Sequence, residues 1–122
     1  MAKILVIDDS AVIRDLLSDC LSDCGHLVDV AANGEEGVRM ALKNSYDVCV
    51  CDVHMPGMNG YDVLSAILSR KPATQLVFTD SLPDEVSEKV REAGARCVLR
   101  KPFELDHLRE VVNRLLAPVK TT

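Results

Sequence analysis

The stretch CVCDVHMPGMNG, residues 49 to 60, carries an apolar run that ends on Asp52 and passes directly into a loop rich in proline and glycine. The run begins upstream as YDVCVCD, residues 46 to 52, whose nearly continuous apolar residues are typical of a buried β-strand. Apolar residues at helical spacing follow the loop, from about Gly60 to Arg70. The stretch therefore predicts a strand, a loop and a helix, with Asp52 at the carboxyl end of the strand.

Similar pairs of an apolar run and a helical pattern lie on both sides of this unit. Predicted strands cover residues 3 to 7, 27 to 31, 46 to 52, 75 to 79 and 96 to 100, and predicted helices cover residues 11 to 23, 35 to 44, 60 to 70, 83 to 93 and 104 to 116. Pro83 suits the first turn of its helix. Apolar strands that alternate with helices predict a parallel sheet covered on both faces. We therefore expect a doubly wound α/β fold that forms one domain over residues 1 to 122.

Composition narrows the class of protein. The chain has 122 residues, of which 48% are hydrophobic and 27% charged, and its formal net charge is -5. Its basic residues are dispersed, so no direct binding of nucleic acid is expected. No stretch reaches the ~18 apolar residues of a membrane span, and the N-terminus turns acidic too early for a signal peptide, so we expect no membrane association and a cytoplasmic location.

The cysteines do not predict a metal site or a disulfide framework. Five of them, Cys20, Cys24, Cys49, Cys51 and Cys97, form an odd set without the spacing of a disulfide scaffold. Cys20 and Cys24 stand four residues apart, but no second pair of ligands has matching spacing. We interpret all five as reduced residues with no metal.

Polar side chains gather where the predicted strands end. They are Asp8 and Asp9 after the first strand, Asp52 at the third, Thr79 and Asp80 at the fourth, and Lys101 at the fifth. A lone aspartate in such a place is usually a helix cap or a turn former, but in doubly wound sheets these ends meet where ligands bind. Carboxylates so close together repel each other unless a cation intervenes, and oxygen ligands suit Mg²⁺. With a lysine and a hydroxyl nearby, Asp52 is predicted to accept phosphate as an acyl phosphate.

Four motifs then resemble the receiver domain of bacterial two-component response regulators, of which the chemotaxis regulator is the single-domain example. They are VIDDS at residues 6 to 10, DVHMPGMNG at 52 to 60, FTDS at 78 to 81 and LRKPF at 99 to 103. The resemblance covers essentially the whole chain and implies a flavodoxin-like strand order of 2-1-3-4-5. It also implies a signalling switch that takes a phosphoryl group from a sensor histidine kinase or phosphotransfer protein and controls a downstream effector. Such a domain, a monomer or weak homodimer, catalyses only its own phosphorylation and dephosphorylation.

The resemblance assigns roles residue by residue. Asp52 is the phosphorylation site and shares Mg²⁺ with Asp8, Asp9 and the backbone carbonyl of His54. After transfer, Thr79 moves toward the phosphoryl group and Lys101 pairs with it. The peptide bond between Lys101 and Pro102 is expected to be cis.

Three residues depart from the family pattern. Val98 stands where an aromatic residue usually swings inward on activation, which puts that coupling to Thr79 in doubt. His54 occupies a variable position whose side chain influences hydrolysis of the phosphoryl group. Asp80 replaces a small residue, and its carboxylate either approaches the acids of the site or caps the helix expected near Pro83.

Three other classes of protein remain as alternatives. A phosphatase of the haloacid-dehalogenase type also uses a strand-end aspartate with Mg²⁺ and a lysine, but it carries a second acid where this chain has His54. A flavodoxin-like electron carrier needs a loop rich in hydroxyls and glycine after the first strand, whereas that loop is acidic here. A degenerate receiver would act only as an interaction module, although all the acceptor residues are intact.

Overall fold

The computed structural model describes residues 1–82 and 84–117, in which strands and helices alternate. The strands are β1 (Lys3–Ile7), β2 (Leu27–Ala31), β3 (Val48–Asp52), β4 (Gln75–Asp80) and β5 (Cys97–Arg100). The helices are α1 (Ala11–Asp23), α2 (Gly34–Lys43), α3 (Gly60–Arg70), α4 (Glu85–Ala93) and α5 (Leu105–Leu116). The predicted α/β fold with five strands and five helices is confirmed.

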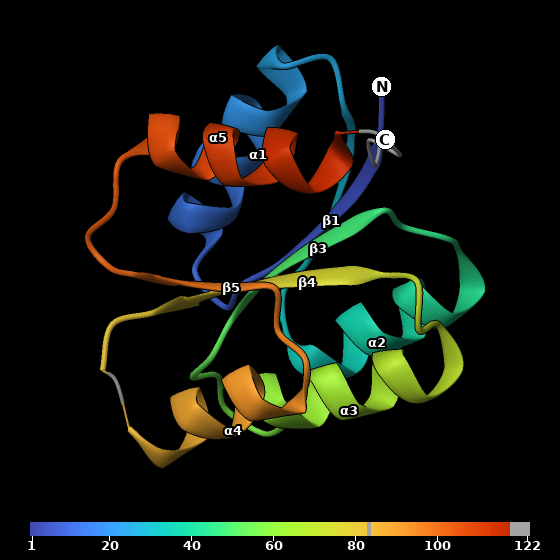
Figure 1. Ribbon diagram of the computed structural model, residues 1–122, viewed down its shortest axis with the longest axis vertical. Coiled ribbons are helices and arrows are strands. Elements are labelled where there is room, and N and C mark those ends of the chain that lie inside the picture. The colour runs from blue at the N-terminus through green and yellow to red at the C-terminus, as the bar shows by residue number, and fades with distance from the viewer. Residues whose placement is uncertain (83, 118–122) are drawn as a thin grey trace, which may run out of the picture.

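The strands form one parallel sheet in the order β2-β1-β3-β4-β5, as predicted. Helices α1 and α5 cover one face of the sheet, and α2, α3 and α4 cover the other (Figure 1). The strand order reverses at β1, which pairs with β2 on one side and with β3 on the other. In such sheets the crevice beyond the carboxyl ends of the strands at this point is where ligands bind.

Side chains that alternate along each strand build a separate core on each face of the sheet. One core packs against α1 and α5 and includes Ile4, Val6, Val48, Val50, Val77, Leu17, Leu108 and Val112. The other packs against α2, α3 and α4 and includes Leu5, Ile7, Cys49, Cys51, Leu76, Phe78, Val63 and Val90. Successive strand residues point to opposite faces, so the strands read as continuous apolar runs when both faces are buried.

The loop between β3 and α3 is held close to the sheet. Asn59 caps α3 and exchanges hydrogen bonds with Asp62, whose backbone N–H lies 3.0 Å from the Asn59 side chain. At Gly60 a Cβ atom would come within 2.9 Å of the Cα atom of Val53 and of the ring of Phe78. Only glycine therefore lets α3 begin this close to the end of β3, directly beside Asp52.

The start of α4 differs from the predicted boundary. Pro83, expected in its first turn, lies outside the described residues, and the helix begins at Glu85. Its N-cap is Asp84, whose carboxylate accepts hydrogen bonds from the backbone N–H groups of Val86 and Ser87. Asp80 therefore does not cap this helix.

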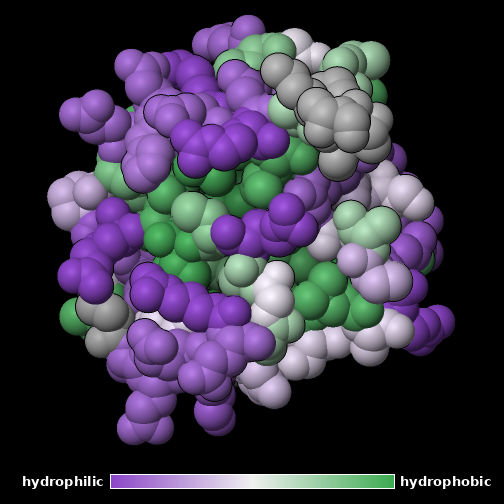
Figure 2. Space-filling view, viewed as in Figure 1, coloured by the Kyte–Doolittle hydropathy of each residue, from purple (hydrophilic) through white to green (hydrophobic). Residues whose placement is uncertain are grey.

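The surface of the molecule is mixed in character. In the view of Figure 2, apolar surface shows through between the polar side chains that cover much of this face. Among the residues that the structure describes, no helix has the length and apolar character needed to cross a bilayer.

Candidate functional site

Three carboxylates meet at the carboxyl ends of β1 and β3. One oxygen from each of Asp8, Asp9 and Asp52 lies within 4.8 Å of the others. Asp8 and Asp52 are buried, whereas Asp9 is exposed. The Oδ1 atom of Asp8 accepts a hydrogen bond from the backbone N–H of Ser10, but its buried Oδ2 atom has no hydrogen-bond partner. A hard divalent cation bound by oxygen ligands would satisfy this orphaned atom, so the residues fit Mg²⁺.

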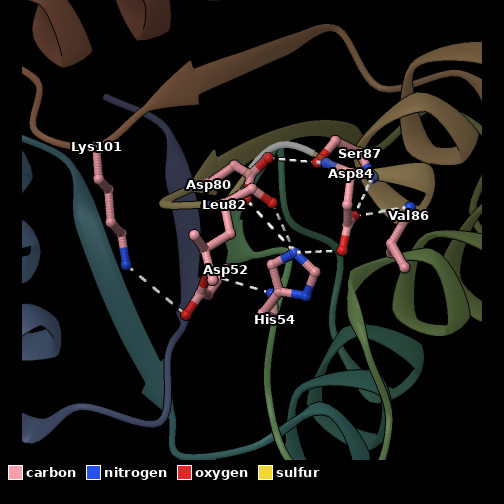
Figure 3. A network of polar contacts seen from close by, with 8 residues as sticks. All are labelled: Asp52, His54, Asp80, Leu82, Asp84, Val86, Ser87 and Lys101. Carbon is pink, nitrogen blue, oxygen red and sulfur yellow. Dashed lines mark hydrogen bonds and ion pairs between the residues drawn. The ribbon is translucent and has the colours of Figure 1, made fainter.

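Lys101 supplies a positive charge close to these acids. Its Nζ atom lies 3.6 Å from Oδ2 of Asp8 and 3.7 Å from Oδ2 of Asp52, and Figure 3 shows the side chain reaching toward Asp52. Its backbone N–H donates to the carbonyl of Asp80 at 2.7 Å, which ties the start of the β5–α5 loop to β4. The peptide bond between Lys101 and Pro102 is cis. One ammonium group thus faces two carboxylates, which leaves the site with excess negative charge.

The surroundings of Asp52 raise its pKa above the ordinary carboxyl value. Burial is the main cause, and the neighbouring charges of Asp8 and Asp9 act in the same direction. Lys101 and the backbone N–H of His54, 3.4 Å from Oδ1, act in the opposite direction without cancelling the effect. The carboxylate form of Asp52 is therefore held in an unfavourable environment, which an added cation would relieve.

Thr79 stands beside Asp52 on the neighbouring strand. Their Cα atoms are partners in the register of β3 and β4. Thr79 is buried, and its hydroxyl has no hydrogen-bond partner. A buried hydroxyl without a partner is uncommon and leaves a donor free for a group added nearby. Val98, on β5, is half-buried and packs against the core under α2, α3 and α4.

Of the two orientations that the sequence allowed for Asp80, the helix cap is wrong, because Asp84 is the N-cap of α4. Asp80 is buried, and it is absent from the group of three carboxylates that the described residues form. Its Oδ1 atom accepts a hydrogen bond from the backbone N–H of Leu82 at 3.0 Å. Its Oδ2 atom accepts a hydrogen bond from the hydroxyl of Ser87 in α4 (Figure 3). Because Asp84 already caps α4, the Asp80 carboxylate is free to bind a side chain inside the helix.

His54 connects Asp52 to this second group of polar side chains. Its backbone N–H faces Asp52, while its ring extends toward the β4–α4 loop (Figure 3). The Nε2 atom lies 3.1 Å from the carbonyl oxygen of Leu82, 3.6 Å from Oδ1 of Asp80 and 3.4 Å from Oδ2 of Asp84. The ring therefore joins the β3–α3 loop to the β4–α4 loop beside the site.

Two contacts at the site were not predicted from the sequence. Arg14 of α1 donates from Nη1 to the backbone carbonyl of Asp8 at 2.8 Å, which supports the acidic turn. Ser87 binds Asp80 from seven residues away. Neither Arg14 nor Ser87 belongs to a motif at a strand end, so the local sequence pattern did not identify either as part of the site.

Comparison with known proteins agrees with this site. The family model of the response regulator receiver domain matches residues 4–113. Protein PilH of Pseudomonas aeruginosa is 33% identical over 120 residues, which cover 96% of this chain and 99% of that protein. The response regulator protein TrrA of Thermotoga maritima has a similar structure, with a TM-score of 0.87, 34% identity and coverage of 95% and 100%.

Several relatives are longer than this chain. The transcriptional regulatory protein HprR of Escherichia coli is 32% identical over 108 residues, which cover 87% of this chain but only 48% of that protein. Protein-glutamate methylesterases are matched over about 30% of their length. In these proteins the matched region is one part of a larger molecule. This chain belongs to the response regulator receiver domain family, the phosphoacceptor switches of two-component signalling.

Proposed function

We propose that Asp52 accepts a phosphoryl group from a histidine of a sensor kinase or phosphotransfer protein, and that the resulting change controls a downstream effector. The observation that carries the proposal is the environment of Asp52. Its buried carboxylate lies 3.7 Å from Lys101 Nζ, beside a partnerless threonine hydroxyl and two further aspartates. A nucleophile, a cation and a free donor are what phosphoryl transfer to a carboxylate requires.

The reaction is a displacement at phosphorus. An oxygen of Asp52 attacks the phosphorus atom and forms a P–O bond, while the P–N bond to the donor histidine breaks and its electron pair leaves with the imidazole. The product is a mixed anhydride on Asp52. Lys101 moves its pairing from the carboxylate to the new phosphoryl oxygens, and the Thr79 hydroxyl donates to another of them. Water later hydrolyses this anhydride, which breaks the bond between Asp52 and the phosphoryl group, releases inorganic phosphate and restores the free carboxylate.

Mg²⁺ is the cofactor that the three carboxylates fit, with Asp8, Asp9, Asp52 and the carbonyl of His54 as its proposed protein ligands. When bound, it supplies positive charge that offsets the added phosphoryl group. The structure of the similar TrrA protein is of a complex with Mg²⁺ and beryllium fluoride, which supports this assignment by analogy.

The remaining proposals concern activity and partners. The domain acts only on its own aspartate, by gaining and losing the phosphoryl group, and works in the cytoplasm as a monomer or weak homodimer. A phosphatase of the haloacid-dehalogenase type would need a proton donor directed at a leaving group. The Nε2 atom of His54 instead faces the carbonyl of Leu82 at 3.1 Å, which favours the receiver function.

Beryllium fluoride is a stable mimic of the phosphoryl group. Together with Mg²⁺ it tests the proposed site without covalent transfer of a phosphoryl group. At about 100 times the dissociation constant, the two together should raise the Tm by roughly 8 to 11 °C, because they bind only the folded site. The Tm of Asp52→Ala should be the same with beryllium fluoride and Mg²⁺ together as with Mg²⁺ alone. Asp19→Asn, which changes an exposed acid on α1, is the matched control and should behave like the wild type. An unchanged Tm of the wild type would refute the proposed site.

A further inference from the structure

A buried carboxylate at the end of β4 forms a hydrogen bond with α4. Asp80 is 2% exposed and directly follows Thr79 in the strand. Its two oxygens bind different segments, the backbone of Leu82 in the loop and the hydroxyl of Ser87 in the helix. A buried carboxylate that loses such a donor is left with an unsatisfied oxygen, so this link constrains the position of α4.

Ser87 is also part of the N-terminal cap of α4. Its hydroxyl oxygen accepts a hydrogen bond from the backbone N–H of Asp84 at 3.2 Å, while the Asp84 carboxylate binds the backbone N–H of Ser87. Ser87 itself is 2% exposed. The position of the first turn of α4 thus depends on the same hydroxyl that holds Asp80.

Two connections lead from the phosphorylation site to Asp80. The first is the backbone of β4, since Thr79 and Asp80 are consecutive residues. The second is His54, whose backbone N–H faces Asp52 at 3.4 Å and whose Nε2 atom lies 3.6 Å from Oδ1 of Asp80 (Figure 3). A phosphoryl group adds close to two negative charges, which act on Asp80 and His54 at short range.

We propose that Asp80 and Ser87 form the link through which the state of Asp52 reaches α4, an inference that rests on the proposed function. When Thr79 moves toward the phosphoryl group, the adjoining Asp80 moves with the strand and displaces Ser87. Val98 has no ring to bury and already packs against the core, so it offers little free-energy difference between two positions. The hydrogen bond from Ser87 to Asp80 instead couples α4 to β4 directly, without an aromatic residue at position 98.

Backbone amide chemical shifts, measured with and without Mg²⁺ and beryllium fluoride, test the link. In the wild type, amides of the first turn of α4 should shift together with those of Thr79 and Lys101. Ser87→Ala should reduce the α4 shifts at least threefold while the shifts at the site and the fluoride affinity stay within twofold of the wild type. Ser69→Ala, which removes an exposed hydroxyl on α3, is the matched control and should leave the α4 shifts unchanged.

Two further variants separate signalling from helix stability. Asp80→Ala leaves the hydrogen bonds between Asp84 and Ser87 in place and should reduce the α4 shifts as Ser87→Ala does. Ser87→Thr keeps the hydroxyl and should restore them. Shifts of wild-type size in α4 of both alanine variants would overturn the link. Site shifts without α4 shifts in the wild type would overturn the link alone, whereas a wild type with no site shifts would overturn the proposed function and the link together.

Discussion

Acetyl phosphate and Mg²⁺ together are expected to add one phosphoryl group to each chain, on Asp52. The buried Asp52 carboxylate lies 3.7 Å from Lys101 Nζ, so a cation is already in place to receive the developing negative charge. The hydroxyl of Thr79 is buried without a partner and can donate to the product. Intact mass measurement should show a gain of about 80 Da, the mass of a phosphoryl group, and fragmentation should place it on Asp52.

The controls for this labelling follow from the geometry. Asp52→Ala should gain no mass, because the only nucleophile in the proposal is removed. Chelation of Mg²⁺ should abolish labelling of the wild type, since Lys101 alone must then balance Asp8, Asp52 and the incoming phosphate. An equal adduct on Asp52→Ala, or none on the wild type with metal present, would contradict the assignment.

Replacement of Asp52 with asparagine is expected to stabilise the metal-free protein at neutral pH, although it destroys the proposed acceptor. Burial and the charges of Asp8 and Asp9 raise the pKa of Asp52, which means that its charged form is disfavoured in the folded state. Lys101 keeps a partner in the variant, because Oδ2 of Asp8 lies 3.6 Å from its Nζ atom. We expect a gain of about 1 to 2 kcal/mol, or roughly 3 to 8 °C in Tm.

The sign of the effect can be tested by its pH dependence. The pKa of Asp52 is higher in the folded state than the ordinary value of 3.8 that we assign to the unfolded chain. Between the unfolded and the folded pKa of Asp52, the folded state therefore binds more protons than the unfolded state. The stability of the wild type falls as the pH rises through this range. Below both pKa values the carboxyl group is neutral in both states, so the advantage of Asp52→Asn should vanish there. Above the folded pKa the advantage should stay constant.

Thermal unfolding of wild type and variant across this pH range, without divalent metal, provides the measurement. Asp19→Asn again serves as the control, because Asp19 is exposed on α1 and its replacement should change the Tm by less than about 1 °C. Saturating Mg²⁺ should narrow the gap between Asp52→Asn and wild type. An Asp52→Asn protein that is less stable than the wild type at neutral pH would show that Lys101 outweighs burial.

Most of the fold could be predicted from the sequence, because strand and helix formation depend on local patterns of apolar residues. Apolar strand residues such as Val48 to Cys51 alternate with helices whose apolar residues recur at helical spacing. That pattern is enough to predict a parallel sheet with helices on both faces. In a parallel sheet all carboxyl ends share one edge, so the meeting of Asp8, Asp52 and Lys101 follows from the topology alone.

The surroundings of Asp80 depended on the three-dimensional structure. The sequence offered two directions for its carboxylate, toward the acids of the site or outward as a cap of the helix, and the cap was wrong. Asp84 occupies the cap position, and the carboxylate of Asp80 instead accepts a hydrogen bond from Ser87, a residue of the first turn of α4. Which donor a buried carboxylate finds depends on the path of the β4–α4 loop and the rotation of α4 about its axis, and no residue pattern specifies either.

The distinction has a physical basis. Strand and helix formation follow from the burial of residues at a regular period, and one periodic segment carries that information by itself. A hydrogen bond between side chains requires two groups to lie within about 3 Å with the correct orientation, a condition set jointly by every packed element between them. For this protein the chain alone therefore predicted the sheet and the acidic rim around Asp52, while only the packing of α4 against β4 selected Ser87 as the partner of Asp80.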